Sequence, residues 1–508
     1  MKKLIGALLT VALIVGLSLV AVVPGRVTSA YYISDDVGNV YDTLLSNVDV
    51  LEGLDFLESD QDNRIAEQID ICEIPASPFN EQVRAADYMQ RMMDLWLEDV
   101  HIDDEGNVIG YRPGTGDGPK LVVAAHLDTV FPLEYDATVT IDDEGILHAP
   151  GIGDDCGGLA ALLSVVRALD DSGITTVGDI MFVGDVGEEG RGDLRGVKNL
   201  FSEVEDIDGF LSIDGSGTTG ITYQGLGSKR FEFTYTGAGG HSWGAFGIPS
   251  PIHAMGRSIA KIADMEVPTD PRTSFTVSVV NGGTAINAIA AECAMQTDTR
   301  SLDPAQLEKT VAELLGYVDQ GVVEENARWG IGIPPGLGLN KTPPGLGEGG
   351  PPGQDKDNPQ GQGKDNPPGL RLPDEWAETY KITVDVNMVG DRPSGTCPDD
   401  AIHVQVACAA TEAIGLEPRL GAASSTDSNI PIFLGVPALT LGGGGRGGNG
   451  HAPNEWFDPT DAYLGSQRVF LAVLGLVGVD GVTEPLLPPG PEYHYEFLGV
   501  EVPDMYIP

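Results

Sequence analysis

Leu121-Val122-Val123-Ala124-Ala125-His126-Leu127-Asp128-Thr129-Val130 is the stretch that decides the fold. Its first five residues form a continuous apolar run, which is typical of a strand buried in a parallel sheet. Further buried strands are predicted at 179–183, 209–213 and 438–441, and helices at 157–169, 401–414 and 466–477. Strands that alternate with helices in this way indicate an α/β domain.

The segment after Gly225 follows a different pattern. A strand, a helix, two strands, a helix and a last strand are predicted at 229–235, 251–265, 273–280, 292–299, 304–318 and 383–389. The order β-α-β-β-α-β is that of a ferredoxin-like α+β sandwich. We therefore expect residues 223–393 to form a smaller domain inserted into the first one, which comprises 35–222 and 394–480.

Three segments lie outside these predicted domains. Residues 1–30 begin with Lys2 and Lys3, continue as an apolar run and end in small residues. This order predicts a signal peptide and therefore a secreted or cell-envelope protein. The apolar run could nearly span a bilayer, so a retained membrane anchor is the alternative. Residues 330–373 are rich in proline and glycine and predict a disordered insertion, and residues 481–508 predict a Pro-rich tail.

Charge excludes several partners. The 508 residues include 76 acidic and 29 basic ones, and the net charge is −47. Such a charge repels nucleic acids and anionic membrane surfaces, so we expect neither as a partner unless the N-terminal segment anchors the chain. The five cysteines are too scattered for a disulfide framework and lack zinc-finger spacing, which indicates buried apolar side chains.

Histidine and acidic side chains follow the predicted strands. His126 and Asp128 lie two residues apart on an extended chain, so their side chains point the same way. Asp128 is therefore placed to hold the second ring nitrogen of a metal-binding His126. The other members of this set are Asp154, Asp155, Glu188, Glu189, Asp214 and His451. Neighbouring side chains on an extended chain diverge, so one of Glu188 and Glu189 can bind metal while the other faces the substrate.

The composition of this set predicts a metal centre. Six carboxylates at one edge of a sheet would repel one another strongly unless divalent cations lay among them. Two histidines with several carboxylates suit Zn²⁺, with Mn²⁺ or Co²⁺ as alternatives. Two such ions can share a bridging carboxylate and together stabilise the oxyanion of a tetrahedral intermediate.

Four motifs carry a family resemblance: His126-Leu127-Asp128-Thr129-Val130, Gly153-Asp154-Asp155-Cys156-Gly157-Gly158, Gly187-Glu188-Glu189-Gly190 and Ser212-Ile213-Asp214-Gly215. They resemble the co-catalytic zinc peptidases, which include peptidase T, glutamate carboxypeptidase, succinyl-diaminopimelate desuccinylase and the aminoacylases. The resemblance covers nearly all of the mature chain apart from the Pro/Gly-rich segment and the tail. It implies a mixed-sheet, three-layer zinc-exopeptidase catalytic domain, in which the inserted domain serves as lid and dimerisation domain.

The resemblance also implies roles for the site residues. Asp154 would bridge two zinc ions, with a cis peptide bond to Asp155. The remaining ligands would be His126 and Asp214 at one ion, and Glu189 and His451 at the other. Glu188 would be the general base that deprotonates the attacking water and later protonates the leaving amine. Cys156 stands where many family members have lysine; that position is not a metal ligand, so the difference concerns local charge.

The inserted domain contains further matches. His241, in Gly237-Ala238-Gly239-Gly240-His241-Ser242, resembles a histidine that reaches the active site, often that of the partner subunit, to help bind the oxyanion. Asn287 and Arg300 resemble a pair that contacts a carboxylate or carbonyl of the substrate, and the guanidinium fork suits a carboxylate. The resemblance therefore implies a homodimer formed through the inserted domain.

We accordingly expect a secreted di-zinc metallopeptidase that hydrolyses amide bonds of short peptides, as a peptidase T-like exopeptidase does. An amidohydrolase that acts on N-acyl or N-carbamoyl amino acids is the alternative. From another class of protein, an inactive secreted binding protein could retain the same fold. The loss of Glu188 or of a ligand would favour that alternative, and none of these residues is lost.

Overall fold

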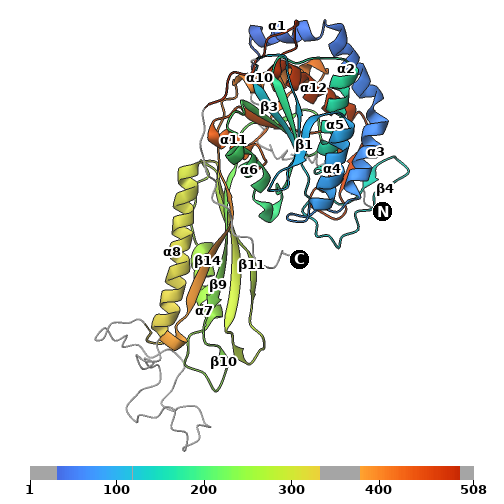
Figure 1. Cartoon of the computed structure of the whole chain (residues 1–508). Helices are drawn as coiled ribbons and strands as arrows, with labels where there is room; N and C mark the ends of the chain where they lie inside the picture. The colour runs from blue at the N-terminus through green and yellow to red at the C-terminus, as the bar shows by residue number, and fades with distance from the viewer. Residues whose placement is uncertain (1–30, 117, 332–377, 492–508) are drawn as a thin grey trace, which may run out of the picture.

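The computed structural model describes residues 31–116, 118–331 and 378–491, and it has a larger and a smaller lobe (Figure 1). The predicted signal peptide, nearly all of the predicted insertion at 330–373 and the end of the predicted tail lie outside the described residues. In the part of the chain that is described, no helix has both the length and the hydrophobicity needed to cross a membrane.

A mixed eight-stranded sheet forms the centre of the larger lobe. Its strand order is β1-β2-β6-β3-β7-β16-β8-β15. The strands are β1 (Glu98–Ile102), β2 (Val108–Arg112), β3 (Lys120–His126), β6 (Asp179–Asp185), β7 (Gly209–Ile213), β8 (Gly220–Thr222), β15 (Arg419–Leu420) and β16 (Ala438–Leu441). Strands β6, β3, β7 and β16 run parallel, whereas β2 and β8 are antiparallel to their neighbours β6 and β16. The strand from which the fold was predicted, β3, therefore lies in the middle of the sheet.

Alternate side chains of β3 enter two cores, one on each face of the sheet. Leu121, Val123 and Ala125 belong to one core, Val122 and Ala124 belong to the other, and all five are fully buried. Because successive side chains of a strand point to opposite faces, a strand that is apolar throughout needs cover on both sides.

Helices provide this cover. One face carries α1 (Asp35–Leu44), α2 (Val48–Ser59), α3 (Gln61–Cys72), α4 (Gln82–Asp94), α5 (Cys156–Asp171), α10 (Ile402–Ala413) and α12 (Tyr463–Val477), and the other carries α6 (Arg195–Glu203) and α11 (Asn429–Leu434). Helices α1 and α2 begin where no helix was predicted, at Ser34 and Asn47, whose side chains accept N–H groups of the first turn. The three-layer α/β architecture is confirmed.

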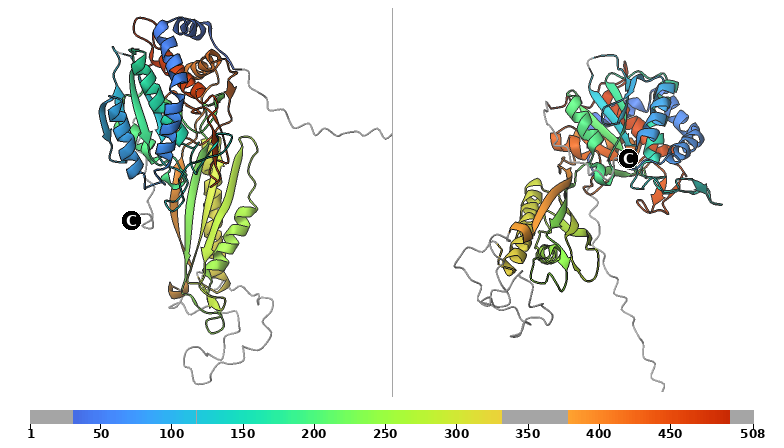
Figure 2. Two further views of the ribbon diagram at one scale, coloured as in Figure 1. Left: turned by 90° about the vertical axis from the view of Figure 1, so that its right-hand side faces the viewer. Right: turned by 60° about the horizontal axis from the view of Figure 1, so that its bottom comes forward.

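The smaller lobe contains an antiparallel sheet of order β11-β13-β9-β14. In chain order its elements are β9 (Gly227–Thr236), α7 (Pro251–Ala263), β11 (Thr273–Gly282), β13 (Glu292–Ser301), α8 (Pro304–Arg328) and β14 (Thr383–Arg392). This order confirms the predicted ferredoxin-like α+β fold. Both helices share a separate core with the sheet, in which Phe233, Met295 and Leu314 are fully buried. Figure 2 shows that the smaller lobe extends away from the larger one.

Two small sheets complete the described fold. In the smaller lobe, β10 (Gly240–His241) pairs with β12 (Ala288–Ile289). In the larger lobe, a sheet of order β17-β18-β5-β4 joins β17 (Arg446–Gly448), β18 (Trp456–Asp458), β5 (Leu147–His148) and β4 (Thr140–Ile141). The loop that connects β17 to β18 contains His451.

Candidate active site

The predicted metal ligands lie at the carboxyl ends of the parallel strands. His126 is the last residue of β3, Asp214 directly follows β7, and Glu189 lies in the loop after β6. Carboxyl ends of parallel strands meet at one edge of a sheet, where loops can gather functional side chains. The loops that contain Asp154 and His451 reach the same edge from the start of α5 and from the β17–β18 hairpin.

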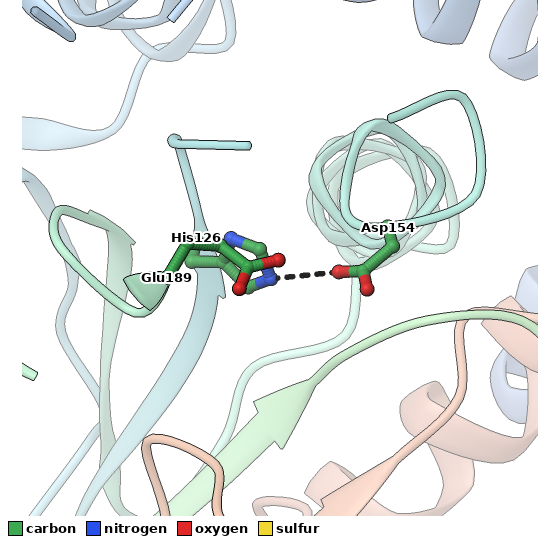
Figure 3. A group of neighbouring side chains, drawn as sticks. All are labelled: His126, Asp154 and Glu189. Carbon is green, nitrogen blue, oxygen red and sulfur yellow. Dashed lines mark hydrogen bonds and ion pairs between the residues drawn. The ribbon is translucent and has the colours of Figure 1, made fainter. Parts of the chain in front are cut away.

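Asp154 is at the centre of this group. Its Oδ1 lies 3.1 Å from Nε2 of His126, and its Oδ2 lies 3.1 Å from Nε2 of His451. Nε2 of His451 is also 2.9 Å from Oε1 of Glu189, and Nε2 of His126 is 4.0 Å from Oδ1 of Asp214. Figure 3 shows the side chains of His126, Asp154 and Glu189 facing one another. The structure thus brings all five predicted ligands together, with one oxygen of Asp154 directed to each histidine.

Asp155 fixes the start of α5 next to this group. The peptide bond between Asp154 and Asp155 is cis, as the family resemblance implied. The buried carboxylate of Asp155 accepts the N–H of Gly158 at 3.0 Å and the N–H of Gly215 at 3.1 Å. Asp155 therefore caps α5 and ties it to the loop that contains Asp214.

The orientation of His126 differs in one detail from the prediction. Its Nδ1 lies 2.9 Å from the main-chain oxygen of Asp128, whereas the carboxylate of Asp128 is 3.8 Å away. That carboxylate instead accepts the N–H groups of Gly187, Glu188 and Glu189, at 2.8, 3.1 and 2.9 Å. Three main-chain donors satisfy a buried carboxylate better than one ring N–H does, so Asp128 holds His126 through its backbone and the Glu188–Glu189 loop through its side chain.

The carboxylates make this site favour positive charge. Hydrogen bonds with Asp154 and Glu189 raise the pKa of His451 to about 11. Burial opposes a charged His126, yet Asp154 and the neighbouring carboxylates raise its pKa well above the ordinary value. Burial, followed by repulsion from Asp154, raises the pKa of Asp214 to about 7. One histidine and one carboxylate on each side of Asp154 fit two divalent cations of the zinc group.

Glu188 directly precedes Glu189 and is not one of the predicted ligands. Burial raises the pKa of its carboxyl group well above the ordinary value, against the opposing effect of Arg392. Nη1 of Arg392 donates to Oε1 of Glu188 at 3.1 Å and to Oγ of Ser425 at 3.1 Å, and Nη2 donates to the main-chain oxygen of Glu188. A carboxyl group with a raised pKa holds a proton more readily than an ordinary one, which suits a group that must take up a proton and release it again.

Arg392 is a site residue that the sequence did not indicate. It ends β14 in the smaller lobe, 204 residues away from Glu188 in the chain. Its buried guanidinium joins the two lobes at the point where Glu188 lies. No local pattern identifies such a residue, because its partner belongs to a remote segment.

The three predicted substrate-binding residues are separated in the structure. The exposed His241 and Asn287 lie together around β10 and β12, where the N–H of Ser242 donates to the main-chain oxygen of Asn287. Figure 1 shows β10 at the tip of the smaller lobe, far from the larger one. Arg300 lies near the other end of β13, and its Nε donates to Asp298 at 2.7 Å.

Arg300 is linked through two other side chains to the loop that contains the predicted ligand Glu189. Asp298, its partner, also accepts Nε of Arg230 at 3.1 Å. Nη1 of Arg230 in turn donates to the main-chain oxygen of Gly190 at 2.5 Å. Among the described residues, therefore, Arg300 is the one of the three that is connected to the loop of a predicted ligand.

Comparisons with known proteins agree with this geometry. A family model described as Peptidase family M20/M25/M40 matches residues 122–475, more than half of the chain. Succinyl-diaminopimelate desuccinylase from Pseudomonas syringae pv. syringae is 28% identical over 259 residues, which cover 47% of this chain and 68% of that protein.

Solved structures share the fold. A tripeptidase from Staphylococcus aureus subsp. aureus is 21% identical, with a TM-score of 0.60 over 81% of this chain and 97% of that one. A Bacillus subtilis protein, described as a dinuclear metal binding peptidase, is 15% identical, with a TM-score of 0.53 over 82% of this chain and 98% of that one. These structures agree in fold with the family model, and it is the match of that model to residues 122–475 that confirms the family resemblance found in the motifs.

Proposed function

Because the chain belongs to peptidase family M20/M25/M40 and is a metallohydrolase of that family, we propose that it hydrolyses amide bonds of short peptides at a pair of zinc ions. The observation that carries the proposal is the position of Asp154 between His126 and His451, with Glu188 adjacent and outside the ligand set. Dinuclear metal binding is typical of the family. The identity of the metal as zinc rests on the His and carboxylate donors.

The site residues have different roles in the proposed amide hydrolysis. Two bound divalent cations would supply positive charge that polarises the amide carbonyl and acidifies a water molecule. Glu188 takes a proton from the attacking water at its carboxylate and delivers it to the leaving amine nitrogen. Arg392 and the main-chain contacts of Asp128 keep Glu188 and its loop in place for both transfers.

Arginines near the site support a substrate with a free carboxylate. The side chains of Arg230 and Arg392 donate to main-chain oxygens of the Glu188–Gly190 loop, and Arg191 directly follows that loop. Arg300 shares the carboxylate of Asp298 with Arg230, in a chain whose net charge is −47. A guanidinium binds both oxygens of a carboxylate, so the partly exposed Arg191, Arg230 and Arg300 suit a peptide terminus or an acidic acyl group. The buried Arg392 is already engaged with Glu188. The similarity to a desuccinylase supports the second candidate, hydrolysis of N-acyl or N-carbamoyl amino acids.

A homodimer would explain the position of His241. β11 is an edge strand of the smaller sheet and exposes Val279 and Val280, and Ile286 in the next loop is fully exposed. An exposed apolar edge strand readily pairs with a second copy of itself. We therefore propose that the smaller lobes pair and that each brings His241 to the site of the other subunit. An extracytoplasmic location remains a proposal that rests on the sequence of residues 1–30.

Replacement of the proposed general base tests the function. We expect Glu188→Gln to retain two zinc-group ions per chain and to lose about 10²- to 10⁴-fold in kcat, because the amide cannot take the proton from water. Metal content is measured by elemental analysis, and hydrolysis by mass spectrometry of a peptide library and of N-acyl amino acids. If the wild-type protein binds no such metal, or if Glu188→Gln hydrolyses amides normally, the proposal is wrong. Cleavage of N-acyl amino acids alone would select the second candidate.

A further inference from the structure

Glu455 is a buried carboxylate that the proposed chemistry does not use. It lies four positions after His451, next to the start of β18, and only 3% of its surface is exposed. No ion pair with Lys, Arg or His is found for it among the described residues. Burial of an unpaired carboxylate costs free energy unless hydrogen bonds compensate for the lost water.

Main-chain N–H groups provide that compensation. Oε1 of Glu455 accepts the N–H of Gly153 at 2.9 Å and the N–H of Asp154 at 3.1 Å. Oε2 accepts the N–H of Gly151 at 3.0 Å. A single carboxylate therefore satisfies three donors of the turn that presents the bridging carboxylate of Asp154.

The glycines of this turn allow the approach. Gly151 has φ +77°, a conformation that other residues rarely adopt. A Cβ atom at Gly153 would lie 3.2 Å from Oε1 of Glu455, closer than most side chains tolerate. The Gly151-Ile152-Gly153 sequence and Glu455 thus depend on each other, although 302 residues separate Gly153 from Glu455.

Glu455 also belongs to the loop of another metal ligand. Within this loop the N–H of Ala452 donates to the main-chain oxygen of Asn449, and the N–H of Glu455 donates to that of Ala452. These bonds form a compact turn around His451. Glu455 belongs to this turn, and its carboxylate binds the turn that contains Asp154. Glu455 therefore sets the spacing between Asp154 and His451.

We infer that Glu455 is a positioning residue of the metal centre. By binding the Gly151–Asp154 turn, it keeps the bridging Asp154 and the ligand His451 at the distance and orientation that metal binding needs. The inference rests on the proposed two-metal site. It does not make Glu455 a ligand, because its two oxygens are already occupied by the N–H groups of the turn.

Two substitutions separate this role from a general effect on folding. Glu455→Gln keeps the shape of the side chain but places an NH₂ group where one oxygen accepted an N–H, so at least one of the three bonds is lost. Glu455→Ala removes all three. The control is Glu325→Gln, because Glu325 is also fully buried and accepts the N–H of Ser250, yet it lies in the smaller lobe away from the predicted metal ligands. Glu325 is in addition paired with Arg257, so its replacement is the more severe test of a general effect on folding.

The experiment measures metal binding without substrate. Zinc affinity is determined by competition with a chromogenic chelator, and the coordination geometry by the visible absorption spectrum of the Co²⁺-loaded protein. We expect zinc affinity to fall by about 10- to 100-fold in Glu455→Ala and by less in Glu455→Gln, as for other groups that orient metal ligands. We also expect the Co²⁺ bands to shift in both variants and to stay unchanged in Glu325→Gln.

Each outcome decides one point. If both Glu455 variants bind zinc within about twofold of wild type and keep the wild-type Co²⁺ spectrum, the inference is overturned. Equal loss in the Glu325→Gln control would also overturn it, because the effect would then be a general loss of stability. A wild-type protein that binds two ions but leaves all amides intact would contradict the proposed function alone, since neither measurement uses a substrate.

Discussion

Two opposing effects act on the carboxyl group of Glu188. Burial raises its pKa, and the guanidinium of Arg392 lowers it. The ionised form of Glu188 is the one that accepts a proton from water, so activity should increase as the pH rises through this pKa. The pH at which activity rises, the acidic limb of the pH profile, therefore depends on Arg392 as well as on burial.

Removal of the guanidinium should move the acidic limb. In Arg392→Met the carboxylate loses its nearest positive partner, its pKa rises further, and the acidic limb of kcat/KM shifts to higher pH by about 1–3 units. The measurement is the pH profile of kcat/KM for a single peptide substrate. Arg392→Lys is the control, because it keeps the charge and should shift the limb less. A limb that stays in place in Arg392→Met would show that Glu188 does not control it.

Some residues of the site could be identified from the sequence, and others could not. A metal site could be proposed because histidines and acids follow the predicted strands at one edge of the sheet. The family resemblance then selected His126, Asp154, Glu189, Asp214 and His451 from that set as the ligands. Glu455 and Arg392 could not be identified in this way. Their partners are main-chain groups or side chains of remote segments, and such contacts leave no local pattern in the sequence.

At the scale of elements, a buried ion pair joins α6 to β14. Nζ of Lys198 donates to Oδ2 of Asp193 at 2.6 Å and to the main-chain oxygen of Asp391 at 2.9 Å. Oδ1 of Asp193 accepts the N–H of Asp391 at 2.8 Å. Both main-chain polar groups of Asp391 are thus held by the larger lobe, and Arg392 is the next residue. The contact therefore places Arg392 against Glu188.

Disruption of this ion pair should destabilise the protein. Lys198→Met leaves the carboxylate of Asp193 buried without its cation, which costs about 3–5 kcal/mol in the free energy of unfolding. Urea denaturation measures the loss, and the double variant Asp193→Asn Lys198→Met should recover part of it. The control is Lys120→Met, whose partner Asp206 is largely exposed, so its loss should be about 1 kcal/mol or less. Equal losses in the two lysine variants would contradict the role of the buried pair.

The elements that could be predicted are those with strong hydrophobic periodicity. β3, α5 and all six elements of the smaller lobe match the predicted segments, although α8 continues ten residues beyond the predicted end at residue 318, to Arg328. The short strands β10, β12, β17 and β18 were not predicted, because two or three residues carry no periodic signal. Two of these strands form the hairpin whose loop contains His451.

At the scale of the whole molecule, His241 lies far from the predicted metal ligands of its own chain. β13 spans ten extended residues, about 30 Å. It lies between β11 and β9, which in Figure 1 run from the tip with β10 toward the larger lobe. A histidine at the tip of one chain cannot serve the site at the other end of the same lobe without a large rearrangement. Its position relative to a second copy is a property of the assembly, which the pattern of one chain does not encode.

Mixing of two inactive variants tests whether His241 acts on the partner subunit. Glu188→Gln lacks the general base and His241→Ala lacks the imidazole, so each homodimer should have very low activity. In a heterodimer of the two, one site combines an intact Glu188 with the His241 of the other subunit. Random exchange of equal amounts makes half of the dimers mixed, each with one complete site, so about a quarter of the wild-type activity should return.

The control for this experiment mixes Glu188→Gln with the double variant Glu188→Gln His241→Ala, which contains no intact Glu188 and should stay inactive. Size-exclusion chromatography with light scattering establishes whether dimers form and exchange. If His241 serves its own subunit, the first mixture will be no more active than the sum of its parents. Recovery in the first mixture and not in the second would mean that the active site is built from two chains, with His241 of one subunit completing the metal centre of the other.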